Sequence, residues 1–155
     1  MLELLVCCAC EKVIFADDKT VSLISLLEEY TVSIPEGAPP PPTGAVSPVN
    51  WAVFAFWRRT NADRAERFEQ QFSLVAPDGE QLLTGIMPFE CSVGVQKMRT
   101  MHPIFGFPIA REGLMDLVIS VRSDGQREWE ERARYPLTVK YAAAESLPTT
   151  EANAS

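Results

Sequence analysis

Hydrophobic and polar residues alternate most regularly in the final third of the chain, between residues 113 and 141. In its first half the apolar positions are every second residue: Met115, Leu117, Ile119 and Val121. In its second half they are Trp129, Ala133, Tyr135, Leu137, Val139 and Tyr141. A period of two over this length is typical of strands with one buried and one solvated face. The Ser-Asp-Gly sequence between the halves supplies the positive φ of a tight turn. The pattern predicts an antiparallel hairpin and an all-β protein.

Shorter segments upstream carry the same kind of pattern. They predict strands over residues 2–15, 21–34, 49–59 and 67–75, with weaker strands over 81–87, 89–97 and 104–109. In the most apolar of these, Trp51, Val53 and Trp57 share one face while Phe54 and Phe56 share the other. That segment is the predicted core strand. About seven to nine strands with no helical pattern favour an antiparallel, immunoglobulin-like β-sandwich, and a closed barrel is the alternative.

The chain length of 155 residues suits one domain, which we assign to residues 1–142. Residues 35–48 hold six of the twelve prolines. Because proline donates no backbone hydrogen bond, this stretch predicts a stiff crossover loop between two strands. A ligand for a proline-binding domain is the alternative for this segment. Residues 143–155 are small, polar and interrupted by proline, and they predict a disordered tail.

Charge and composition narrow the function classes. The formal net charge of −7 and the interleaving of acidic and basic residues argue against a nucleic-acid partner, which needs clustered Lys and Arg. The longest apolar runs are far shorter than the roughly 20 residues of a membrane-spanning helix. The first residues lack the basic region of a signal peptide. We therefore expect a cytoplasmic protein with no membrane partner.

Cysteine and histidine offer the main route to chemistry. Cys8 and Cys10 lie on one face of the predicted first strand, whereas Cys7 lies on the other. A zinc site would need further ligands, and Cys91 and the only histidine, His102, are the obvious additions. An enzyme or metal site would centre on that pair. We expect buried thiols, no bound metal, no cofactor and no enzymatic activity, because no nucleophile–base set stands out.

Acidic residues in the predicted turns suggest a third class of function. They are Asp17, Asp18, Asp78 and Asp124. Some sandwiches gather such side chains at one end to hold calcium, and a loop-tip carbohydrate or lipid site is the corresponding hypothesis. The spacing matches no dedicated calcium loop, so solvated turn residues are the preferred interpretation.

Several segments together resemble a family of small, uncharacterised bacterial all-β proteins. They are CEKVIFADDKTVSLISLL, the tryptophan-rich WAVFAFWRR, the PDGE turn and the closing FPIAREGLMDLVISVRSDG…YPLTV. The resemblance covers about residues 5–140 and rests mostly on turns and core positions. It implies an immunoglobulin-like sandwich and no reaction, cofactor or catalytic residue.

The best candidate for a functional surface is the segment IFGFPI and the residues before it. Glycine and proline interrupt the segment, so not all of its apolar side chains need be internal. We predict a surface for self-association or a protein partner that comprises Met101, His102, Ile104, Phe105, Phe107 and Ile109. The alternative is that the segment closes one end of the sandwich. The function that we expect is a non-enzymatic binding or assembly module.

Overall fold

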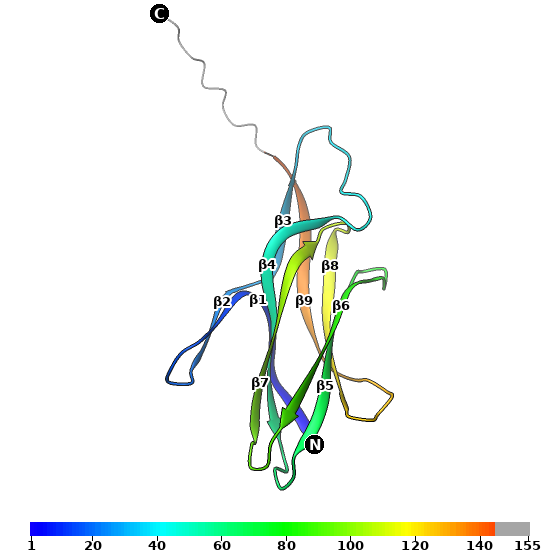
Figure 1. Cartoon of the computed structure of the whole chain (residues 1–155). Coiled ribbons are helices and arrows are strands. Elements are labelled where there is room, and N and C mark those ends of the chain that lie inside the picture. The colour runs from blue at the N-terminus through cyan, green and yellow to red at the C-terminus, as the bar shows by residue number, and fades with distance from the viewer. Residues whose placement is uncertain (145–155) are drawn as a thin grey trace, which may run out of the picture.

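Nine β-strands make up the regular structure of the chain (Figure 1). The structure, a computed structural model, describes residues 1–144, and no helix occurs among them. The strands are β1 (Leu2–Phe15), β2 (Val21–Leu26), β3 (Glu29–Ile34), β4 (Val46–Arg59), β5 (Glu66–Val75), β6 (Gln81–Cys91), β7 (Lys97–Pro108), β8 (Gly113–Ser123) and β9 (Glu130–Ala143).

The strands form two sheets that face each other. Sheet A has the order β2-β1-β4-β7, and sheet B has the order β3-β9-β8-β5-β6. The predicted all-β sandwich with up to nine strands is therefore confirmed. The predicted purely antiparallel arrangement is wrong at one place, because β3 pairs with β9 in parallel. A crossover between the two sheets lets β3 run in the same direction as the last strand.

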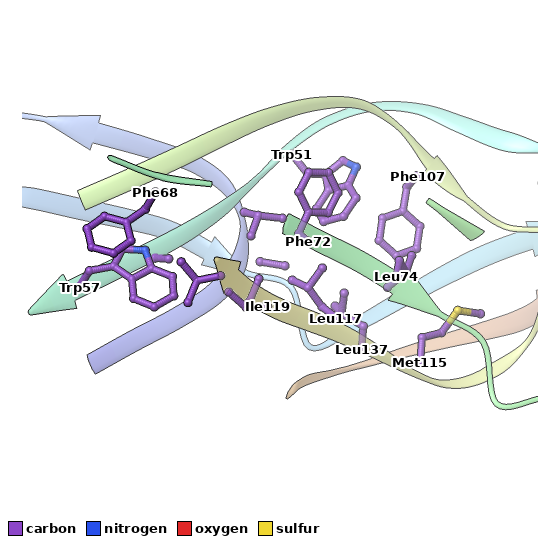
Figure 2. Close-up of a cluster of buried hydrophobic side chains, with 14 of the residues drawn as sticks. Trp51, Trp57, Phe68, Phe72, Leu74, Phe107, Met115, Leu117, Ile119 and Leu137 are labelled. Atoms are coloured by element: carbon purple, nitrogen blue, oxygen red, sulfur yellow. The ribbon is translucent and has the colours of Figure 1, made fainter. Parts of the chain in front are cut away.

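The core lies between the sheets and is densely aromatic (Figure 2). Strand β4 lies between β1 and β7, and its Trp51, Val53 and Trp57 side chains are buried in this core. The predicted core strand is thus confirmed. Phe54 points to the other side of the same strand, away from sheet B, and yet it is only 5% exposed.

A small set of hydrogen bonds satisfies the polar atoms of the core. The Trp57 Nε1–H donates to Gln70 Oε1 at 2.9 Å, and the Thr100 hydroxyl donates to the same oxygen at 2.6 Å. Trp51 Nε1–H donates to the Gly106 carbonyl at 3.0 Å. These bonds give the buried polar groups the partners that they need. They also join β4 and β7 of sheet A to β5 of sheet B.

The segment predicted as one strand over residues 21–34 is two strands in different sheets. Strand β2 belongs to sheet A and β3 to sheet B. The apolar side chains change parity between Leu23 and Tyr30, and Ser25 has a positive φ of 54°. The two changes end the first strand and redirect the chain.

The three weak strands predicted over residues 81–109 are two longer strands. Pro88 lies inside β6 and Pro103 inside β7, where the sequence suggested loops. Both strands are sheet edges, and an edge tolerates proline because the missing N–H can face outward. His102 therefore lies on a strand, and not in the loop that its neighbour Pro103 suggested.

The proline-rich crossover links β3 of sheet B to β4 of sheet A. Strand β4 already begins at Val46, before the predicted end of the loop at residue 48, and Pro48 falls at an irregularity in its pairing with β7. At the other end of the chain, Ala143 still belongs to β9. Residues 145–155 of the predicted tail lie outside the described residues.

Residues 11–26 form a hairpin that we call the arm. Strand β1 pairs with β4 only as far as Cys10, and beyond it pairs with β2 alone. Figure 1 shows the arm standing out from the side of sheet A and pointing back toward the end where β7 begins. The turn of the arm meets that end, because Arg99 of β7 donates to the Lys19 carbonyl at 2.7 Å.

Candidate functional site

The six residues of the predicted association surface divide between two faces of β7 and its continuation. Met101 and Phe105 pair with Phe54 and Asn50 on the outer face of sheet A. His102, Ile104 and Phe107 point between the sheets, and Ile109 follows the strand and packs against the core. The alternation of side chains along a strand thus separates residues that are contiguous in sequence.

Phe107 is fully buried. Its ring stacks on Tyr30 with the centroids 4.7 Å apart and contacts Trp51 at 5.3 Å. It belongs to the core, and it contributes nothing to an exposed surface. Phe107 therefore fits the alternative interpretation, in which the segment closes one end of the sandwich.

Phe105 is the most exposed aromatic side chain of this segment, at 72%, and Val46 beside it is 56% exposed. Gly106 between them has a positive φ of 91°, and a Cβ placed on it would lie 3.5 Å from Val46. A cavity of about 230 Å³ opens next to them. We call the larger apolar residues that line this cavity the Phe105 surface: Val46, Leu82, Leu83, Phe105 and Pro108.

Sequence reasoning missed Val46, Leu82 and Leu83 as parts of this surface. Val46 fell in the predicted loop, and the two leucines belong to a strand of the other sheet. The two strands are edges of different sheets, and the packing of the sheets brings β6 close to the end of β7. The rim of the cavity carries opposite charges, because Arg111 contacts Glu80 at 2.6 Å and Asp78 at 3.7 Å.

His102 lies in a mostly apolar setting. Its ring meets Phe72 edge to face with the centroids 4.6 Å apart, and its Nε2 lies near the backbone of Gly85. Burial lowers the pKa of this imidazole, which favours its neutral form at neutral pH.

Cys91 lies elsewhere, at the end of β6. Its carbonyl accepts a hydrogen bond from the buried Arg59, and burial raises the pKa of its thiol while Arg59 lowers it. Cys91 lies six positions along the strand from Gly85, which adjoins His102, and that length corresponds to about 20 Å. The two side chains that an enzyme or zinc site would have joined are therefore not brought together.

Cys8 and Cys10 do share one face, as the spacing predicts, because they pair with Phe54 and Ala52. Both are buried on the outer face of sheet A. Burial and the neighbouring Cys10 raise the pKa of the Cys8 thiol to about 12. Among residues 1–144, no group of three or more His, Cys, Asp or Glu side chains could hold a metal ion.

The turn aspartates lie at separate places. Val75 pairs with Asp116 and Phe68 pairs with Ser123, so the turns with Asp78 and Asp124 lie at opposite ends of sheet B. Asp17 and Asp18 lie in the turn of the arm, and the Asp18 carboxylate accepts hydrogen bonds from Thr20. These side chains do not gather at one end of the sandwich, as a shared calcium site would require.

The outer face of sheet A brings the predicted buried thiols next to the second face of the core strand. Cys8, Cys10, Ala52 and Phe54 are buried there. The arm lies on this side of the sheet (Figure 1), and its turn contacts β7 through Arg99. Arg99, which holds the turn of the arm, also lies over the Phe56 ring, 5.8 Å from its centroid.

In the described part of the chain, no helix is long and apolar enough to cross a membrane. Neither a protein-family model nor a curated protein sequence matches the chain.

Proposed function

We propose that this protein is a non-enzymatic binding or assembly module, and that it associates with a second copy of itself through the Phe105 surface. The observation that carries the proposal is the exposure of Phe105 and Val46 side by side at the mouth of an apolar cavity. Exposed apolar clusters next to a hollow are typical of association surfaces.

The charges around the cavity favour a second copy as the occupant. A two-fold contact brings each patch against itself, so a surface with a single sign of charge repels its copy. The rim here holds Arg111 together with Asp78 and Glu80. Rotation about a two-fold axis can set the cation of each copy against the carboxylates of the other.

An immunoglobulin-like arrangement is part of the proposal. The order β1-β4-β7 corresponds to A-B-E of an immunoglobulin sheet, and β9-β8-β5-β6 corresponds to G-F-C-C′. The match supports a scaffold that presents loops and edges to partners. The chain departs from antibody domains in having four free cysteines and its buried tryptophans on β4.

Light scattering on the purified protein tests the association. We expect a dimer for the wild type and a monomer for Phe105→Ser, because the change removes the central apolar side chain without touching the core. Leu114→Ser is the matched control, since Leu114 is exposed to 58% on the outer face of sheet B. The control should remain a dimer.

A wild-type protein that is monomeric at all concentrations would refute self-association. A dimer that persists in Phe105→Ser would move the interface to another surface. Circular dichroism of each variant shows whether the sandwich is retained, so that loss of the dimer is read only from folded protein.

A further inference from the structure

Four strands form the edges of the two sheets, and their free backbone groups differ in how they are protected. The edges are β2 and β7 in sheet A, and β3 and β6 in sheet B. An unprotected edge accepts a strand from another chain, and proteins block this with proline, charge or irregular backbone. The comparison of the four edges therefore indicates where a partner strand can bind.

Proline blocks two of the edges. Arg59 N–H donates to the Gln96 carbonyl, which sets the even-numbered residues of β7 toward β4 and the odd-numbered ones toward the free edge. Pro103 thus removes a donor from the middle of the free edge. Pro88 cannot donate from β6 either.

Charge and polarity protect the third edge, β3. Its first residue, Glu29, forms an ion pair with Lys140 at 2.8 Å. The outward side chains after it are Thr31 and Ser33.

Strand β2 (VSLISL) lacks proline and charge, and its one irregular residue, Ser25 with a φ of 54°, comes after Val21 and Leu23. The bond from Ala16 N–H to the Thr20 carbonyl sets the even-numbered residues toward β1, so the backbone groups of Val21 and Leu23 face the free edge. Ile24 is 40% exposed and Leu26 is 51% exposed, which gives an added strand apolar side chains to pack against.

The charges beside β2 select the kind of partner. Asp17 and Asp18 precede the strand, and Glu28 and Glu29 follow it, with Lys19 as the cation in these flanks. In an antiparallel pair of two β2 strands, the first flank of each copy meets the second flank of the other. Such a pairing sets carboxylates against carboxylates and disfavours a second copy. A strand with Lys or Arg at both ends has the complementary charges.

We propose that the free edge of β2 binds an extended apolar segment of another protein that has basic residues at both ends, as an added β-strand. This binding mode is β-augmentation, in which backbone hydrogen bonds supply affinity and the flanking charges supply specificity. The site is separate from the Phe105 surface and does not depend on it.

Fluorescence anisotropy with two labelled peptides tests the proposal. One peptide is Lys-Lys-Val-Thr-Val-Thr-Val-Lys-Lys, and the other has glutamate in place of each lysine. We expect the full-length protein to bind the basic peptide at least about tenfold more tightly than the acidic one, and the difference to shrink at high salt.

The double variant Asp17→Lys/Glu28→Lys should reverse that preference. Both side chains are exposed and make no hydrogen bond among the described residues, so the change leaves the fold intact. Leu23→Pro should abolish binding of both peptides, because it removes a free-edge donor. Phe105→Ser is the control and should bind both peptides like the wild type.

Equal affinity for the two peptides, or a preference that the double variant leaves unchanged, would refute the proposal. Loss of peptide binding in Phe105→Ser would assign the peptide to the Phe105 surface and refute it as well. Because Leu23→Pro can disturb the arm, the charge reversal is the deciding measurement. The oligomeric state measured by light scattering is independent of all these outcomes.

Discussion

The two outer faces of the sandwich differ sharply in chemistry. The outer face of sheet B is polar and carries ion pairs, among them Arg122 with Glu69 and Arg134 with Asp116. The outer face of sheet A carries Cys8, Phe54 and Phe56 at comparable positions. A face of ion pairs can remain in water, whereas a face of thiols and aromatic rings needs a cover. The arm lies on the side of the thiols and rings, and Phe105 on the same face of sheet A is 72% exposed.

The largest expected effect comes from Phe54→Ala. If the arm makes this outer face a second core, the variant should lose about 3–5 kcal/mol of unfolding free energy, as a fully internal phenylalanine does. Val118→Ala, on the outer face of sheet B, is the comparison and should lose less than about 1.5 kcal/mol. Urea denaturation measures both. Equal losses would mean that the two faces do not differ.

Alkaline pH should act on the outer face of sheet A through the buried Cys8 thiol. The pKa of Cys8 is raised to about 12, so the unfolded chain releases its proton at a lower pH than the folded one. Stability from this thiol is complete below about pH 9 and is lost as the pH rises toward 12. The loss is on the order of 2–3 kcal/mol at pH 11.

Denaturation of the wild type and of Cys8→Ala across this pH range measures the contribution of the thiol. The variant should show the shallower loss of stability with pH. Parallel curves would indicate that Cys8 ionises as easily in the folded protein as in the unfolded chain.

Arg99→Ala should loosen the arm by about 1 kcal/mol, because it removes the hydrogen bond to Lys19 and the contact with Phe56. We expect faster reaction of Cys8 and Cys10 with a thiol reagent, while global unfolding changes little. Arg58→Ala, which breaks an exposed ion pair with Glu3 on the same sheet, should leave the thiol reactivity unchanged. Unchanged reactivity in Arg99→Ala would show that this contact does not hold the arm.

The smallest effect is expected on the polar face. Glu69→Gln breaks the ion pair with Arg122 and should cost less than about 1 kcal/mol, since partly exposed pairs contribute little. The stability difference from the wild type should shrink further in 1 M salt. If Glu69→Gln lost as much unfolding free energy as Phe54→Ala, ion pairs would stabilise sheet B as strongly as apolar packing stabilises sheet A.

Much of the fold could be predicted from alternation alone. The final hairpin and the core strand with Trp51 and Trp57 were predicted correctly, because their side chains repeat with a period of two. The prediction was wrong at Trp129, which precedes β9 and does not belong to it. The split between β2 and β3 could not be predicted, because the residues on both sides of it favour strand. Only the shift of the apolar side chains from odd to even positions marks the break. Pro88 and Pro103 led to predicted breaks where the structure has continuous strands. A sequence does not reveal which strands lie at an edge, where proline is tolerated.

The candidate site was predictable only in part. The segment from Met101 to Ile109 was singled out as a whole, and the fold then buried Phe107 and exposed Phe105. Periodicity within a segment can separate two faces, but it cannot say which face meets water when both are apolar. The apolar partners of Phe105 come from β4 and β6, and such long-range proximity follows from topology and not from local pattern.

The parallel pairing of β3 with β9 has a consequence for the order of events during synthesis. Strand β3 emerges from the ribosome early, but its only neighbour within sheet B is the last strand of the described chain. Sheet A can assemble once β7 has emerged, whereas sheet B must wait until β9 inserts between β3 and β8. Until then the nascent chain presents unpaired strand edges, and a chaperone would protect it most over this interval.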